Sequence, residues 1–124
     1  MQLLNEKEIN YDFNYPESIK KVVSLGIVNL CPWWIMDHKQ AKNLFLVIKK
    51  LYPKRRLIPF ATRQDNDDVA CFEEGKGEEV QIIHIGASEG WEQVEVYHNV
   101  YDWLKSAIDA MREVNLSDCL NGLG

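Results

Sequence analysis

One serine lies in a pattern that some hydrolases use for nucleophilic catalysis. Residues 86–90 read Gly-Ala-Ser-Glu-Gly and match the G-x-S-x-G turn, which presents a serine between a strand and a helix. The apolar run Val80 to Ile85 precedes the motif as required, but Trp91 to Tyr97 alternates like a second strand, so no helix follows. His98 is the only histidine after Ser88. The context predicts a glycine-rich turn, and a small hydrolase using Ser88 with His98 is the alternative.

A cluster of acidic residues could also carry chemistry. Asp65, Asp67 and Asp68 place three carboxylates within four residues, which could hold a divalent metal or form an acid–base pair. A calcium-binding EF-hand loop would need a glycine after its third ligand and a distal glutamate in register, and neither is present. We therefore expect a solvated hairpin tip. If the cluster has a function, its ionised carboxylates suit contact with a basic surface.

Histidines and cysteines offer little support for a metal site. His84 shares a strand face with Val80 and Ile82, which favours a hydrogen-bonded histidine in the core or at its rim over a proton relay with His98. No HExxH motif or two-histidine helical spacing is present, so a zinc enzyme has no basis in the sequence. We expect no catalytic residues, no metal and no cofactor.

The chain has three cysteines, Cys31, Cys71 and Cys119. Their odd number and the absence of any CxxC unit argue against a disulfide framework and against structural zinc. Each is therefore predicted to be a small buried thiol.

Composition limits the possible partners. The chain has 124 residues, 46% of them hydrophobic, which suits one domain with one core. It carries 14 basic and 19 acidic residues, and the net charge of -5 disfavours nucleic acid and anionic lipid while favouring a cationic partner. No run approaches the roughly 18 apolar residues of a membrane span. Met1 to Phe13 is charged where a signal peptide would be apolar, so we expect a cytoplasmic protein.

One local basic cluster runs against this overall charge. Its members are Lys49, Lys50, Lys54, Arg55 and Arg56. By pattern alone the cluster resembles a nucleic-acid or localisation patch. A structural role is favoured, because cations are stabilised by the exposed carbonyls at the C-terminus of a helix.

Four short apolar runs predict an antiparallel meander in the middle of the chain, because clusters of turn-forming residues separate them. The predicted strands are Leu57 to Ala61, Asp68 to Phe72, Val80 to Ile85 and Gln93 to Tyr97. Apolar residues occupy both faces of the middle strands. Helices should therefore cover one face, and a loop or a partner the other.

Helices are predicted on either side of these strands. They cover residues 16–25, 38–52 and 100–114, with Asp37 and Asn99 as N-caps of the last two. Cys31-Pro32-Trp33-Trp34 is predicted to be a packed connector, and residues 116–124 a frayed tail. The expected fold is α+β: a single domain of residues 1–124 with a central, mainly antiparallel sheet of about four to six strands flanked by helices.

Five segments between Leu57 and Met111, about half of the chain, form a spaced pattern. They are Leu57-Ile58-Pro59-Phe60-Ala61, Asp67-Asp68 before Cys71-Phe72, the next apolar strand, Gly90-Trp91, and Tyr101-Asp102-Trp103-Leu104. This pattern resembles the SUKH superfamily, which includes yeast cell-wall-synthesis regulators and bacterial immunity proteins. The resemblance implies an α+β domain without catalysis, whose bacterial members bind and neutralise toxin domains, often nucleases. The family's usual glycine-containing segment between its early helices is replaced here by Cys-Pro-Trp-Trp.

We therefore expect a non-catalytic protein-binding domain, an immunity protein that neutralises a cognate bacterial toxin, with a basic toxin domain as partner. Asp65, Asp67, Asp68 and Glu89 would supply a negative rim, and Trp91 or Trp34 an aromatic anchor. Trp103 is expected in the core. The alternatives are a regulatory or scaffold domain that binds an endogenous protein, and a small hydrolase that uses Ser88 or the Asp65 to Asp68 cluster.

Overall fold

The computed structural model of the chain describes residues 2–121. The elements, in chain order, are α1 (Glu6–Ile9), α2 (Glu17–Ser24), β1 (Asn29–Leu30), β2 (Trp33–Ile35), α3 (His38–Leu51), β3 (Leu57–Arg63), β4 (Asp68–Glu73), β5 (Val80–His84), β6 (Gln93–Tyr97), α4 (Val100–Met111) and α5 (Leu116–Asn121). Within these residues, no helix is both long enough and apolar enough to cross a membrane.

The strands form one sheet in the order β1-β2-β3-β4-β5-β6, and every pairing is antiparallel. The predicted α+β fold with a central antiparallel sheet is confirmed. The prediction of a connector at Cys31 to Trp34 is wrong, because Trp33 and Trp34 begin β2 and only Cys31-Pro32 form the turn from β1. Strands of two and three residues are too short to show a period in sequence.

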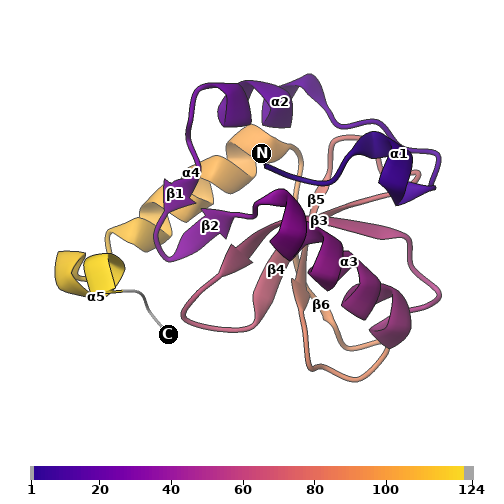
Figure 1. Cartoon of the computed structure of the whole chain (residues 1–124). Helices are drawn as coiled ribbons and strands as arrows, with labels where there is room; N and C mark the ends of the chain where they lie inside the picture. The colour runs from indigo at the N-terminus through magenta and orange to yellow at the C-terminus, as the bar shows by residue number, and fades with distance from the viewer. Residues whose placement is uncertain (1, 122–124) are drawn as a thin grey trace.

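Helices cover both faces of the sheet, because the strands alternate between two buried clusters. One cluster joins α3 to the sheet and contains Ile48, Tyr52, Leu57, Val69, Cys71 and Ile83. The other brings Ile19, Val22, Val100, Trp103 and Ala107 of α2 and α4 against Ile58, Phe60, Phe72, Val80 and Ile82. In Figure 1, α3 crosses the sheet on the viewer's side, and α2 lies beside α4. A helix therefore occupies the face where a loop or a partner was predicted.

Aromatic side chains form the centre of the larger cluster. Trp103 of α4 is fully buried, as predicted, and its ring lies edge-on to Trp33 at 5.5 Å and to Phe60 at 5.0 Å. Phe60 stacks on Phe72 at 4.6 Å. These contacts attach α4 to the middle strands of the sheet.

The first predicted helix begins one residue later than expected, since Pro16 is the N-cap and α2 starts at Glu17. The predicted starts of the other two helices are confirmed by their caps. Asp37 accepts a hydrogen bond from the backbone N–H of Gln40 in a capping box, and Asn99 accepts one from Asp102. The helix predicted over 100–114 ends earlier than expected, since α4 stops at Met111 and not at Val114. The chain then turns into α5, so the predicted frayed tail is helical over 116–121; residues 122–124 lie outside the described residues.

The prediction of three separate thiols is wrong for two of the cysteines. Cys31 and Cys119 form a disulfide with their Cα atoms 5.8 Å apart, across a sequence separation of 88 residues. Only Cys71 matches the prediction, as a buried free thiol. Burial raises the pKa of the Cys71 thiol well above its usual range, which keeps it protonated and unreactive.

Candidate protein-binding site

The antiparallel meander brings two turns to the same end of the sheet. Residues 64–67 connect β3 to β4, and residues 85–92 connect β5 to β6. The backbone N–H of Ile85 donates to the Asp67 carbonyl at 3.0 Å, which joins the two connections directly. We call residues 64–68 and 85–92 the acidic end.

Five of the six predicted contact residues lie on the acidic end. Asp65 and Asp67 are in the first turn and Asp68 opens β4, whereas Glu89 and Trp91 are in the second connection. The first turn is built locally, because the Asn66 side chain accepts a hydrogen bond from the backbone N–H of Asp68 at 2.8 Å. The fold therefore collects carboxylates that are up to 24 positions apart in sequence.

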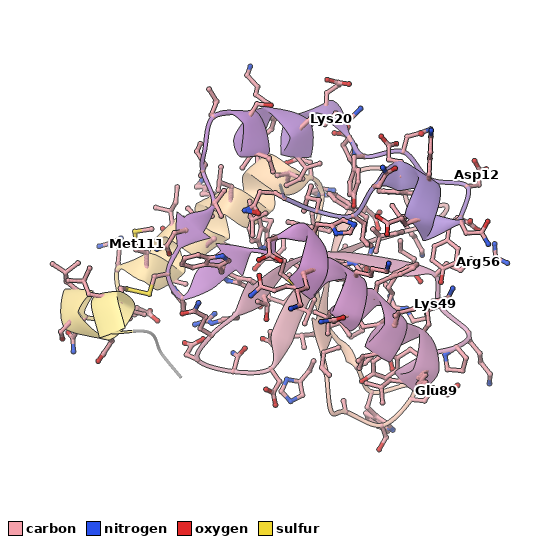
Figure 2. The ribbon with its side chains drawn as sticks, viewed as in Figure 1. Asp12, Lys20, Lys49, Arg56, Glu89 and Met111 are labelled. Carbon is pink, nitrogen blue, oxygen red and sulfur yellow. A yellow bond between two sulfur atoms is a disulfide. The ribbon has the colours of Figure 1, made fainter. Side chains whose placement is uncertain are left out.

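Basic side chains pair with three of these four carboxylates. Arg63 donates two hydrogen bonds to Asp65, at 2.6 and 3.1 Å. Lys54 Nζ lies 3.6 Å from Glu89, which Figure 2 shows beside the C-terminal end of α3. In the part of the chain that the structure describes, Asp67 takes part in no ion pair. The acidic end is thus less negative than its carboxylates alone suggest, and Asp67 is the member without an ion-pair partner among the described residues.

The third pair joins Asp68 to His84, the histidine that was predicted to be hydrogen-bonded. His84 Nδ1 lies 2.9 Å from Asp68 Oδ1, and the imidazole is 46% exposed. Asp68 and His84 face each other directly across β4 and β5. His84 is therefore a hydrogen-bonded histidine at the rim of the sheet, as predicted.

Trp91 is the most exposed large apolar side chain among the described residues, at 82%. Its backbone N–H donates to the Ser88 carbonyl at 2.9 Å, which closes a turn just before it. The Tyr52 hydroxyl donates to the Ala87 carbonyl at 2.8 Å and so attaches the connection to the end of α3. Gly90 adopts a φ of 97°, which few other residues tolerate. The Trp91 indole is thus exposed to solvent, on a turn whose backbone is hydrogen-bonded to Tyr52.

Arg55 supports this turn from within the protein. Its guanidinium binds Glu73 through two hydrogen bonds of 3.0 and 2.8 Å and Glu92 through one of 3.0 Å. The other Glu92 oxygen accepts the backbone N–H of Gly90 at 2.6 Å. The Glu73 hydrogen bonds are the main cause that raises the pKa of Arg55. Burial alone would raise the pKa of Glu92, but backbone N–H groups and Arg55 together lower it.

This network was not predicted from the sequence. A structural role for the basic cluster is confirmed for three of its members, since Arg55 pairs internally, Arg56 pairs with Glu74 at 2.9 Å and Lys49 lies over the Tyr11 ring at 5.5 Å. Their partners are glutamates and an aromatic ring, whereas the carbonyls at the end of the helix were expected. Nothing local in the sequence distinguishes Glu92 from the exposed glutamates near it, because its burial and its partner depend on the α3–β3 connection.

Trp34 does not belong to the same surface as Trp91. It lies on β2 opposite Thr62 and is half-buried. Because β3, β4 and β5 separate β2 from β6, the two strands are about 19 Å apart at the usual spacing of strands in a sheet. The two predicted aromatic anchors therefore cannot act as one patch.

The alternative hydrolase site is not assembled. The motif at 86–90 is a turn, as predicted, and β6 follows it in place of a helix. Ser88 and His98 flank the five residues of β6, which span about 17 Å. Among residues 2–121, no hydrogen bond joins Ser88 to a histidine, and no cluster of three His, Cys, Asp or Glu side chains is arranged to hold a metal ion.

The chain was compared with models of protein families, with curated proteins and with solved structures, and none of the three comparisons gave a match.

Proposed function

We propose that this chain is a cytoplasmic, non-catalytic protein-binding domain of the SUKH type, and that its acidic end binds and neutralises a basic domain of a cognate bacterial toxin. The observation that carries the proposal is the 82% exposure of Trp91 on a turn held by Tyr52, Glu92 and Arg55. A buried indole removes a large apolar area from water, and tryptophan is enriched among residues that dominate binding energy.

The charges beside Trp91 support a basic partner. Asp67 has no ion pair among the described residues, and the side chain of Glu89 remains 44% exposed although it lies near Lys54. A cationic surface placed on this end would gain contacts with both carboxylates, while an acidic surface would be repelled. Because Trp91 follows Glu89 by two residues, one partner surface can meet the aromatic group and the charges together.

Trp91→Ala is expected to weaken binding to the toxin domain encoded beside this chain's gene by about 30-fold, the effect typical of a dominant contact residue. Isothermal titration calorimetry with the purified toxin domain measures the change. Leu25→Ala is the matched control, because Leu25 is 67% exposed at the end of α2 and lies outside the acidic end. Equal affinities for the Trp91 and Leu25 variants would exclude Trp91 as the anchor. An adjacent gene that encodes no toxin would favour the regulatory or scaffold alternative.

Asp67→Lys is expected to slow association with the same toxin domain several-fold at low ionic strength, because a charge at the rim mainly affects the steering of a charged partner. The difference should shrink near 0.5 M salt, where the screening length falls to about 4 Å. Stopped-flow measurements over a series of salt concentrations test this. Glu78→Lys is the control: it changes the net charge equally, but Glu78 lies in the β4–β5 turn at the opposite end of the sheet. If both variants slow association equally, net charge and not the acidic end is responsible.

A further inference from the structure

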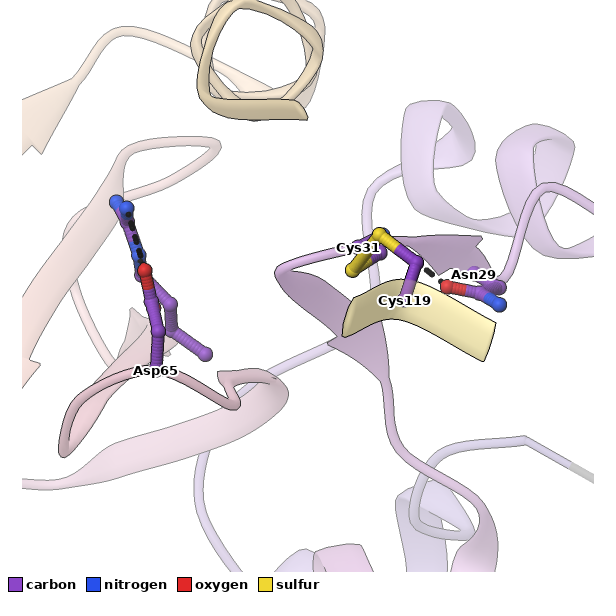
Figure 3. Close-up of a disulfide and its surroundings, with 5 residues drawn as sticks. Asn29, Cys31, Asp65 and Cys119 are labelled. Atoms are coloured by element: carbon purple, nitrogen blue, oxygen red, sulfur yellow. Dashed lines mark hydrogen bonds and ion pairs between the residues drawn. A yellow bond between two sulfur atoms is a disulfide. The ribbon is translucent and has the colours of Figure 1, made fainter. Parts of the chain in front are cut away.

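We infer that Cys31 and Cys119 form a reversible thiol–disulfide site for a dithiol reductant, and that its oxidation state decides whether α5 is held on the domain. The bond joins the turn between β1 and β2 to a helix near the end of the chain (Figure 3). It therefore links two segments that no strand pairing connects.

Little else holds α5 in place. Leu116 and Leu120 are 73% and 76% exposed, so they contribute little burial. Within residues 2–120, no hydrogen bond or ion pair joins residues 116–120 to any residue before Asn115. In Figure 1, α5 projects from the body of the domain.

The packing beneath α5 is open. A groove of about 390 Å³ is lined by Met111 at the end of α4, by Val114 in the turn after it, and by Leu116 and Leu120 of α5. Figure 2 shows Met111 beside the disulfide. A helix of six residues is not stable in water by itself, because nucleation costs more than so few hydrogen bonds return. Without the covalent bond, α5 should therefore detach and lose its helical structure.

The chemistry is a two-electron exchange. A thiolate of the dithiol attacks the sulfur of Cys119, which is half-buried, whereas Cys31 is only 7% exposed. The Cys31 thiolate leaves and takes up a proton. The second thiol of the reductant then attacks the mixed disulfide and releases the Cys119 thiolate, which is protonated in turn. The protein gains two electrons and two protons, and the dithiol becomes a disulfide.

The third cysteine does not take part. Cys71 is fully buried in the cluster beneath α3, and burial raises the pKa of its thiol, so no thiolate is available for exchange. The exchange is therefore confined to one pair of cysteines. In an oxidising compartment α5 is tethered, and in a reducing one it is free, as is typical of the regulatory disulfides found in the cytosol.

Hydrogen–deuterium exchange of the full chain, oxidised or treated with dithiothreitol, tests the inference. Amides of residues 116–121 are expected to exchange at least tenfold faster after reduction, while those of β3, β4 and β5 remain unchanged. Cys119→Ser without reductant should reproduce the reduced pattern. Cys71→Ala should leave the response to dithiothreitol intact, and thiol titration of the native, reduced protein should count two reactive thiols.

Two results would overturn the inference. If α5 stays equally protected in the reduced protein and in the Cys119→Ser variant, other contacts hold it. If reduction also exposes the amides of β3 to β5, the disulfide supports the whole fold and does not act as a local tether.

Discussion

Replacing Arg55 with methionine is expected to lower the free energy of unfolding by about 3 kcal/mol or more, since removing one partner of a buried ion pair leaves the others uncompensated. The side chains of Glu73 and Glu92 are only 12% and 7% exposed, and both depend on this guanidinium. Methionine preserves the apolar stem of arginine, so the loss reports on the charge and its hydrogen bonds.

Urea denaturation followed by tryptophan fluorescence measures this change. Arg56→Met is the matched control: Arg56 is 61% exposed, so solvent screens its pair with Glu74 and the loss should stay below about 1 kcal/mol. Adding Glu73→Gln and Glu92→Gln to the Arg55 variant should restore part of the stability, because no unpaired carboxylate then remains. Equal losses for Arg55→Met and Arg56→Met would contradict the assignment of Arg55 as an internal support.

The same substitution should affect the proposed binding surface. Arg55 holds Glu92, and Glu92 holds the backbone of Gly90 directly before Trp91. A network of this kind keeps the backbone of the turn in one conformation, which reduces the conformational entropy lost on binding. In the proposed function, the stability of the interior and the backbone conformation of the turn that carries Trp91 therefore depend on one arginine.

Trp103→Ala is expected to be at least as destabilising, by about 3–5 kcal/mol, because it removes a large buried side chain and leaves a cavity. Trp103 has no exposed surface and lies edge-on to the rings of Trp33 and Phe60. It attaches α4 to the sheet, so its loss should loosen the helix as well as the aromatic cluster. Chemical denaturation monitored by far-ultraviolet circular dichroism provides the measurement.

Two control variants test whether the loss of stability comes from the burial of Trp103 and not from the loss of a tryptophan as such. Trp91→Ala should change the unfolding free energy by no more than about 0.5 kcal/mol, because its side chain is exposed. Trp103→Phe should lose less than Trp103→Ala, because the indole Nε1 has no hydrogen-bond partner among the described residues and only volume is removed. A similar loss for Trp91→Ala and Trp103→Ala would show that Trp103 is not the centre of the core.

Local patterns were sufficient to predict most of the fold. The strands β3 to β6 follow from alternating apolar residues between turn residues, and each depends mainly on its own segment. The starts of α3 and α4 follow from Asp37 and Asn99, whose side chains bind N–H groups three residues ahead. Strands that follow one another through short turns pair as neighbours, so the placement of Asp67 and Trp91 at one end also follows from the meander.

Tertiary structure decided the features that join distant segments. The Cys31–Cys119 bond links residues 88 positions apart, which no spacing rule could pair. Arg55 and Lys54 pair with Glu92 and Glu89 only because the segment after α3 reaches the β5–β6 connection. The sequence alone thus determined that the segments of β3 to β6 and of α2 to α4 become strands and helices, since that choice depends on neighbours along the chain. It did not predict β1, β2 or α5, which are too short to show a period. Contacts in three dimensions decide the remaining features. They leave Asp67 without an ion pair among the described residues, hold the turn beneath Trp91 and attach α5 through the disulfide.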